Sequence, residues 1–433
     1  MKTRHVLAQA GLAALALAAQ PAGAFDIELS NGWKATIRGF VAARGDYDES
    51  NMGGSEPLFP PRDGTPEADE STLRFSANQT QLGFGIRAPD YGGLINQGYL
   101  EFDFLNEQIP PDDRPVTASP RLRHAWWSLG WNGGNSSLLV GQTNVLFGDL
   151  LPDLTYDNLN LSLGSLFGRE PQVRYTHIMP LATGSDFTFA GSVNAPNSGF
   201  FNEATDTAET TAVPYLHAKI AYHNDRWGKA DYFGFENGPA RPLELALSGF
   251  IGREKIDQVA IAGTEEVQAW GLAASALVPI IGIRDDRRAG SLSVMGQLWI
   301  GSNMDSYFGG NGQGIYETAA GDVDGIEGRG FFVGAKYFVT DRLWLNAIYG
   351  YEENDLDDLV NAGTPFRIAS GLFSGATFGT PGVGDARNVN VTLWYSPLQN
   401  LYTGLGWDYR KASYNDGVDG TNNRVSLSLF YNF

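Results

Sequence analysis

The chain has 433 residues, of which 42% are apolar and 18% charged; it contains 54 Gly, 10 Trp, 18 Tyr and 25 Phe, and no Cys. Without Cys, disulfide frameworks, thiolate metal sites and thiol nucleophiles are excluded. The formal net charge of −19 leaves no net basic footprint, so nucleic acid is excluded as an expected partner.

Residues 1–24 form the first predicted element. They combine a basic start at Lys2 and Arg4 with a short apolar run and a small-residue ending before Phe25. This pattern is typical of a secretory signal peptide cleaved after Ala24. A short anchor helix is the alternative, but the apolar run is shorter than the roughly 20 residues that a spanning helix needs. We therefore expect a signal peptide at 1–24 and a single domain at 25–433.

Alternation of apolar and polar residues, bounded by turn residues, predicts about sixteen β-strands in that domain. Long connections rich in Gly, Asp, Asn and Pro alternate with short ones. The connection at 225–241 is long where a short one is expected, which leaves an extra strand or an insertion open. The predicted strands lie near residues 33–47, 72–87, 97–107, 121–131, 136–147, 171–180, 185–195, 213–224, 242–253, 265–278, 290–302, 329–339, 342–353, 387–396, 400–412 and 421–433.

Each predicted strand has one apolar and one polar face, which also fits a soluble sandwich. Three features favour a membrane barrel instead: strands of about ten residues or more, the rhythm of long and short connections, and aromatic residues near strand ends. These aromatic residues include Trp126, Trp127, Trp131, Tyr349, Tyr351, Tyr395, Trp407 and Tyr409. The predicted fold class is all-β: a transmembrane antiparallel β-barrel of about 16 strands with an infolded constriction loop.

The last predicted strand ends with alternating apolar residues at Leu429, Tyr431 and Phe433. Such an ending resembles the signal that the bacterial barrel assembly machinery reads in its substrates. We therefore expect that machinery as a partner and the bacterial cell outer membrane as the location. Contacts with outer-membrane lipid and lipopolysaccharide are expected to follow.

Charged residues within the strands are assigned to the lumen, because Arg or Lys on the lipid face costs about 2–4 kcal/mol at the bilayer midplane. In the strand near 121–131 this rule places Arg121 and Arg123 inward and Leu122 and Trp126 outward. The same assignment to the pore lining is made for Arg174, Gln142, Lys219 and Lys336.

The connection at 148–170 is long and unusually rich in Leu for an exposed loop. If it folds into the barrel, Asp149, Asp153 and Asp157 face the basic wall across a narrowed channel and create a transverse field. The alternative is a loop that lies over the rim or against a neighbouring subunit.

Three segments, RLRHA at 121–125, LLVGQT at 138–143 and GREPQVRYT at 168–176, resemble the DcaP-like outer-membrane porins, and the similarity extends over 72–178. That resemblance implies sixteen-stranded, trimeric channels for dicarboxylates and other small anions. It also implies that Arg121, Arg123 and Arg174 line the anion path and that Arg169 lies where the infolded loop rejoins the wall. Members of the family often carry further Arg near the second strand, where this chain has NQTQ at 78–81.

Two rival functions are the alternatives to a channel. A hydrolase would need a nucleophile and a base, but no G-x-S-x-G occurs. His124 and His177 are assigned to the girdle or the outer face, which leaves His217 as the candidate to test. A structural or adhesive closed barrel is the second alternative. The predicted function is a non-enzymatic porin for passive diffusion of small hydrophilic solutes, preferring small organic anions such as dicarboxylates.

No cofactor or metal is expected. The acidic segments 321–328 and 351–358 do not have the spacing of an EF-hand loop, so solvated loops are favoured over calcium sites.

Overall fold

β-Strands make up most of the described part of the chain. The computed structural model describes residues 25–52, 59–107, 118–148, 162–182, 184–195, 211–231, 240–285, 287–307, 312–370, 377–379 and 382–433. Within these ranges, no α-helix has the length and apolarity needed to cross a membrane.

The first half of the chain contains β1 (Phe25–Glu28), β2 (Lys34–Asp48), β3 (Thr72–Ser76), β4 (Gln81–Arg87), β5 (Ile95–Glu107), β6 (Ala118–Trp131), β7 (Ser136–Asn144), β8 (Arg169–Ala182), β9 (Ser185–Asn194) and β10 (Tyr215–Ala230). The second half contains β11 (Arg241–Asp257), β12 (Thr264–Ile281), β13 (Leu292–Ser302), β14 (Ile315–Thr318), β15 (Val323–Gly325), β16 (Glu327–Thr340), β17 (Leu343–Asp355), α1 (Asp357–Ala362), β18 (Phe366–Ile368), β19 (Val383–Leu398), β20 (Leu401–Tyr414) and β21 (Asp419–Asn432). Short 3-10 turns lie at Ser30–Gly32, Pro66–Asp69 and Asn132–Gly134.

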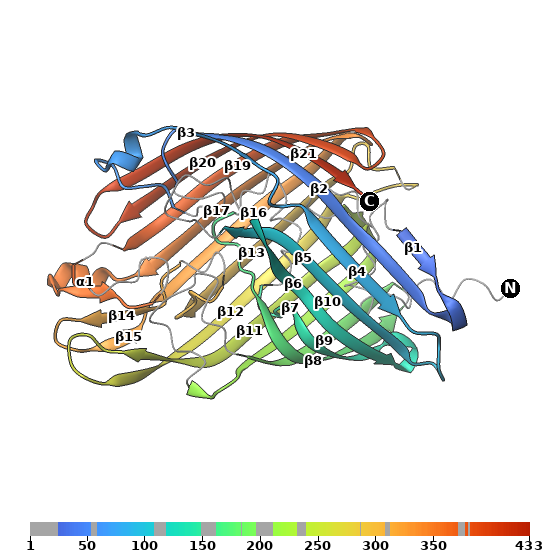
Figure 1. Cartoon of the computed structure of the whole chain (residues 1–433), viewed down its shortest axis with the longest axis horizontal. Helices are drawn as coiled ribbons and strands as arrows, with labels where there is room; N and C mark the ends of the chain where they lie inside the picture. Colours follow the sequence, from blue (N-terminus) through green and yellow to red (C-terminus); the bar gives the residue numbers. More distant parts are fainter. Residues whose placement is uncertain are drawn as a thin grey trace.

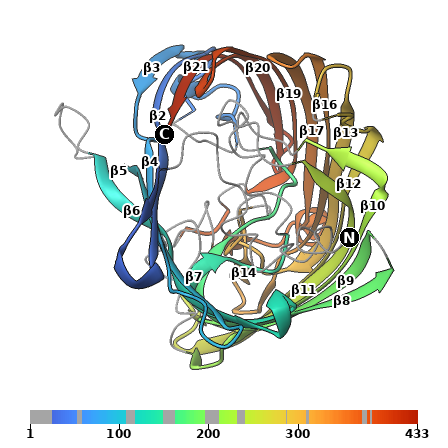
Figure 2. The same ribbon diagram turned by 90° about the vertical axis from the view of Figure 1, so that its right-hand side faces the viewer.

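The strands form one closed antiparallel barrel with sixteen strand positions (Figure 2). Closure comes from β2 and β21, which pair from Phe40 with Asn432 to Asp48 with Arg424. β3 and β4 share one position along β2, and β1 pairs with the start of β2 beyond the end of β21. Closure joins the first and last barrel strands through hydrogen bonds, as is needed to cross a bilayer with strands.

The barrel has two different ends (Figure 1). The terminal end carries β1, the end of β21 and tight turns such as the one between β16 and β17. The loop end carries the long connections, including those that contain β14, β15, α1 and β18. The connections at 258–263 and 415–418 are short exceptions at this end. The predicted rhythm of long and short connections is therefore largely correct.

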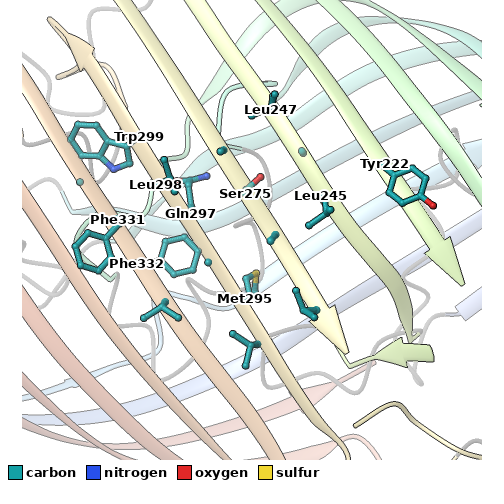
Figure 3. A pocket seen from close by; sticks show the side chains of 18 of the residues that line it. Tyr222, Leu245, Leu247, Ser275, Met295, Gln297, Leu298, Trp299, Phe331 and Phe332 are labelled. Atoms are coloured by element: carbon teal, nitrogen blue, oxygen red, sulfur yellow. The ribbon is translucent and has the colours of Figure 1, made fainter. Parts of the chain in front are cut away.

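The outer face is apolar and the inner face is polar. In β21, Leu427 is 64% exposed and its neighbour Ser426 is completely buried. On the outer face of β10–β13 and β16, a shallow apolar hollow of about 1100 Å³ is bordered by outward-pointing residues such as Leu245, Leu298 and Phe331 (Figure 3). An apolar band on the outside fits surrounding hydrocarbon, which confirms the predicted transmembrane barrel.

Two predicted segments differ from the structure in detail. The strand near 72–87 is interrupted at 77–80, where the Thr80 hydroxyl accepts a hydrogen bond of 3.2 Å from the Ala42 amide and so replaces the missing strand partner. Residues 225–230 and Arg241 of the long connection at 225–241 belong to strands, and residues 232–239 lie outside the described residues. β10 continues past a register shift to Ala230, and β11 begins at Arg241, so no extra strand is needed there.

At the loop end, β14, β15 and β18 form a small separate sheet. Its central ion pair joins Arg367 Nε to Glu317 Oε2 at 2.6 Å, and both side chains are buried. The amides of Val259 and Ala260, in the turn between β11 and β12, donate to the same carboxylate at 2.9 and 2.7 Å from Oε1. This sheet, which we call the loop sheet, is therefore fixed to the barrel wall by a buried charge.

Candidate functional site

A β-bulge in β6 determines which side chains enter the lumen on this part of the wall. Glu101 of β5 pairs with His124, and the next residue, Phe102, pairs with Leu122, so Arg123 is the extra residue. A bulge of this kind places two consecutive side chains on the same face. Arg123 and His124 both face inward as a result.

The inward arginines of β6 are paired with acids of the neighbouring strand. Arg121 Nε and Nη2 lie 3.0 and 2.7 Å from the two carboxylate oxygens of Asp103. Arg123 contacts both acids, with Nε 2.8 Å from Glu101 Oε1 and Nη1 2.8 Å from Asp103 Oδ2. The side chain of Arg121 is 30% exposed and that of Asp103 is fully covered. The guanidinium therefore faces the lumen and the carboxylate lies behind it.

Arg38 of β2 extends this group. Its Nε donates a hydrogen bond of 2.7 Å to the Tyr99 hydroxyl, and its guanidinium carbon lies 4.4 Å from the centre of the Tyr99 ring. Tyr99 in turn donates to Glu101. We call Arg38, Tyr99, Glu101, Asp103, Arg121 and Arg123 the arginine wall. Only Arg121 and Arg123 of this group were predicted from the sequence, although the same alternation rule applied to residues 97–107 places Glu101 and Asp103 inward.

A second charged group lies where the barrel closes. Arg424 Nε and Nη2 of β21 lie 2.7 and 2.9 Å from the carboxylate of Asp48 on β2. Arg44 and Asp46 are 2.6 Å apart, and Arg410 and Asp408 of β20 are 2.7 Å apart. All six side chains face inward and are almost completely buried. This group was not predicted from the sequence, because the apolar face of those strands gives no sign of how the inward charges pair.

Arg169 and Arg174 of β8 lie beside the connection between β7 and β8. Arg174 Nε donates to Gln172 Oε1 at 2.8 Å, and its Nη2 donates to the Asn144 carbonyl. The guanidinium carbon of Arg169 lies 5.4 Å from the centre of the Phe167 ring. Arg169 is the first residue of β8, which agrees with its expected place where the loop rejoins the wall.

The connection between β7 and β8 enters the barrel and contacts the opposite wall. The Leu163 amide donates to Asn388 Oδ1 at 3.0 Å, the Gly164 amide to Glu352 Oε2 at 3.2 Å and the Leu166 amide to Gln297 Oε1 at 2.9 Å. These acceptors belong to β19, β17 and β13. We call residues 162–167 the crossing segment. Asp149, Asp153 and Asp157 lie outside the described residues.

Two glycines allow this close approach. Gly164 has a φ of +72°, and a Cβ atom there would overlap the carbonyl oxygens of Phe331 and Tyr351. On the wall, a Cβ atom at Gly350 would lie closer than 3.0 Å to the Leu163 carbonyl oxygen, Asn388 Oδ1 and Ser162 Oγ. The segment therefore rests directly on backbone, which larger residues would prevent.

An aromatic cluster fills the space between the loop and the wall of β10–β13. Phe147 lies 4.8 Å from Phe250 and 5.2 Å from Tyr307, measured between ring centres. Trp299 of β13 also donates from its indole nitrogen to the Gly164 carbonyl at 2.9 Å. Both described ends of the loop are thus anchored inside the barrel, and this packing accounts for the apolar residues Phe147, Leu163 and Leu166.

The structure corrects three expectations, the first two through the bulge in β6. Trp126 is buried on the inner side, where its ring centre lies 5.8 Å from that of Tyr99, and Trp127 is exposed in its place. His124 faces inward rather than outward, with Nδ1 3.0 Å from Thr143 Oγ1. Gln142 is on the outer face with Val140, so it does not line the pore, and its amide donates to the Leu122 carbonyl at 2.9 Å.

The two lysines face inward as expected but are held in ion pairs. Lys219 Nζ lies 3.2 Å from Glu244 Oε1. Lys336 Nζ lies 3.0 Å from Asp231 Oδ1 and packs over the rings of Phe338 and Trp344. Lys336 is 1% exposed, so its charge is far less accessible than that of Arg121.

The histidine considered for hydrolysis is part of the aromatic packing. His217 is 4% exposed; its Nε2 lies 3.2 Å from the Tyr307 hydroxyl and 3.7 Å from Glu170 Oε2. His177, within β8, has its Nδ1 atom 3.0 Å from Ser136 Oγ. Within the described ranges, no group of three or more His, Asp or Glu side chains is arranged to hold a metal ion.

Comparison with known proteins gives matches to solved structures. No family model matches the sequence, and no curated protein matches it. The outer membrane channel DcaP of Acinetobacter baumannii superposes with a TM-score of 0.66 at 20% identity, over 94% of this chain and 99% of that chain. This chain has the fold of an outer-membrane channel. An anion-selective porin from Comamonas acidovorans (TM-score 0.52, 12% identity, 93% and 100% coverage) and OprB of Pseudomonas putida (0.53, 13%, 92% and 94%) share it.

Proposed function

We propose that the protein is an outer-membrane porin through which small hydrophilic solutes diffuse passively. The observation that carries this proposal is the crossing segment inside a closed barrel, because a loop fixed to the opposite wall narrows the lumen of a channel. The polar and charged inner face supports the same role. No catalytic step is proposed.

The preferred solutes are small organic anions, dicarboxylates or similar acids. In the arginine wall, three guanidiniums face two carboxylates, and Asp103 is covered by the arginines in front of it. A passing solute therefore meets positive charge first, which favours anions in a narrow pore. Arg169 and Arg174 add two further cations beside the loop.

Export, assembly and membrane contacts follow from this role. Residues 1–24 direct export and are removed, and the C-terminal residues Leu429, Tyr431 and Phe433 are read by the barrel assembly machinery. The outer face contacts outer-membrane lipid and lipopolysaccharide, and three chains assemble as a homotrimer.

Liposome swelling tests the proposed transport. Vesicles that contain the purified chain are diluted into isotonic solutions of a neutral sugar, a dicarboxylate or a diamine of similar size. We expect swelling with the small solutes and the fastest swelling with the dicarboxylate. Vesicles with verified, folded barrels that do not swell in any solute would refute the porin and favour a closed structural barrel.

A further inference from the structure

The turn that follows β13 holds a cluster of buried oxygen atoms. Asn303 has a φ of +53°, a left-handed conformation that Asn tolerates better than most residues. Its Nδ2 donates a hydrogen bond of 2.9 Å to Glu254 Oε2 on β11, which fixes the amide plane. With the amide nitrogen turned toward Glu254, the amide oxygen points to the other side.

Three polar side chains converge on Gly314, just before β14. Asn303 Oδ1, Ser370 Oγ and the carboxyl carbon of Asp305 all lie within 3.0 Å of the position that a Cβ atom of residue 314 would take. Asn303, Asp305 and Ser370 are each 1% exposed. The three groups come from separate segments: the turn after β13 for two of them and the end of β18 for Ser370.

Two of these oxygen atoms have unused hydrogen-bonding capacity. Within the described part of the chain, Asn303 Oδ1 and the Ser370 hydroxyl have no hydrogen-bond partner. A buried polar oxygen without a partner costs about 1–3 kcal/mol, so two at one point indicate a group that binds both. An acidic side chain beside two neutral oxygens suits a cation better than an anion.

Glu254 supplies a second buried negative charge beside this point. It is completely buried and accepts hydrogen bonds from the neutral Tyr215 hydroxyl and from Ser306 Oγ, the latter at 3.3 Å. The carboxylates of Glu254 and Asp305 thus flank the amide of Asn303. Two carboxylates with amide and hydroxyl oxygens form an all-oxygen environment.

We propose that Asn303 Oδ1, Ser370 Oγ and the Asp305 carboxylate bind one Ca²⁺ ion, with Glu254 providing further negative charge. Ca²⁺ accepts carboxylate, amide and neutral oxygen ligands in flexible geometry, whereas Mg²⁺ demands a strict octahedron and retains its waters. The ion would tie the turn after β13 to β14 and β18 and so hold the loop sheet in place. Two carboxylates therefore lie at the site. The calcium proposal does not depend on the transport function proposed above.

Equilibrium dialysis of the full-length chain in detergent, stripped with a chelator and titrated with radiolabelled CaCl₂, tests the site. We expect one ion per chain that equimolar MgCl₂ does not displace, with a Kd of about 10⁻⁴–10⁻³ M, as in extracellular calcium modules. Asp305→Asn should raise the Kd about tenfold or more, because ligand charge sets affinity. Asp357→Asn, an exposed acid in the first turn of α1, is the matched control and should leave binding unchanged.

Two further variants separate a cation from a simple polar network. Gly314→Ala fills the point of convergence and should abolish binding while the far-ultraviolet spectrum of the barrel remains. Asn303→Asp adds a carboxylate and should keep or strengthen binding. The proposal is overturned if the folded parent binds no ion, if Asp305→Asn binds as the parent does, or if Asp357→Asn weakens binding equally.

Discussion

The amide of Leu163 donates a hydrogen bond of 3.0 Å to Oδ1 of Asn388, a residue 225 positions later in the chain and on the opposite side of the barrel. The same Asn388 oxygen lies 3.3 Å from the Ser162 hydroxyl. One wall residue therefore holds two consecutive residues of the crossing segment. The diameter of the proposed channel depends on this contact and on its neighbours at Glu352 and Gln297.

Asn388→Ala should loosen the crossing segment. The change leaves the Leu163 amide without its acceptor, at a cost of about 1–3 kcal/mol. The population of chains whose crossing segment has left the wall should therefore be roughly ten times larger than in the parent. We expect larger and noisier single-channel currents in a planar bilayer. Thr392→Ala, another buried inward residue of β19, is the control. Identical currents in the parent and in Asn388→Ala would mean that the segment does not set the channel width.

Gly350→Ala tests the same contact by steric means. The added methyl group would overlap the Leu163 carbonyl and Ser162 Oγ, so the crossing segment must move away from β17. We expect conductance to rise as it does for Asn388→Ala, with the double variant no more conductive than the stronger single variant. A fall in conductance would show that the segment moves into the pore instead.

The arginine wall should determine charge selectivity. Replacing Arg121 and Arg123 by Ala exposes Glu101 and Asp103, and a unit charge at about 4 Å is worth about 1 kcal/mol in water. We expect the anion-to-cation permeability ratio, from reversal potentials, to fall roughly fivefold. Arg329→Ala removes a guanidinium from the outer surface, where it pairs with Glu353, and should leave the ratio unchanged. An equal effect of Arg329→Ala would argue for long-range charge rather than a local wall.

Removing the acids of the arginine wall should shift the ion selectivity in the opposite direction. Glu101→Gln with Asp103→Asn removes the acids behind the guanidiniums, so the anion preference should increase. Glu353→Gln serves as the outer-surface control. If both the arginine and the acid variants shift selectivity toward cations, the residues act through folding rather than through their charge.

Glu317 should make the loop sheet sensitive to acid. Burial raises the pKa of the Glu317 carboxyl, but the amides of Ala260 and Val259 and the Arg367 guanidinium outweigh it, so the pKa lies below its usual value. In the unfolded chain the pKa of a Glu carboxyl is about 4.3, and in the folded chain that of Glu317 is lower. The ionised carboxylate therefore stabilises the loop sheet above about pH 4.3, and this stabilisation is lost as the pH falls through the folded-state pKa. Glu317→Gln should lack this contribution at every pH.

Deuterium exchange of the loop-sheet amides measures this effect. The exchange rates of the parent and of Glu317→Gln are compared at the same pH, because their ratio cancels the intrinsic pH dependence of exchange. We expect the parent to be better protected above about pH 5 and the two chains to converge in stronger acid. A difference that stays constant as the pH falls below the folded-state pKa would exclude titration of Glu317 as its cause.

The architecture was predictable because it depends on regular alternation. All sixteen predicted strands are present, and the exposed Leu427 and buried Ser426 of β21 follow the period of two. The position of Trp126 was not predictable, since one extra residue in β6 reverses the faces of everything that follows and leaves no compositional signal. Gln142 was wrong for a different reason: β7 pairs with β6 without a register shift, so the period of two already places Gln142 on the outer face with Val140.

The candidate site was predictable only in part. Arg121, Arg123 and Arg174 follow from the cost of burying a cation in lipid, so their direction could be inferred. Their partners could not, because pairing depends on the register between β5 and β6. The contact of Leu163 with Asn388 joins distant segments and needs the closed barrel before it can be seen.

The reversal potential of the unmodified protein tests the central claim most directly. Purified protein is inserted into a planar bilayer across a KCl gradient, and insertion is verified independently. We predict stepwise conductance with a reversal potential on the chloride side, as expected for a water-filled pore behind an arginine wall. A verified barrel without current would contradict the porin, and a reversal potential on the potassium side would contradict the proposed role of Arg121 and Arg123.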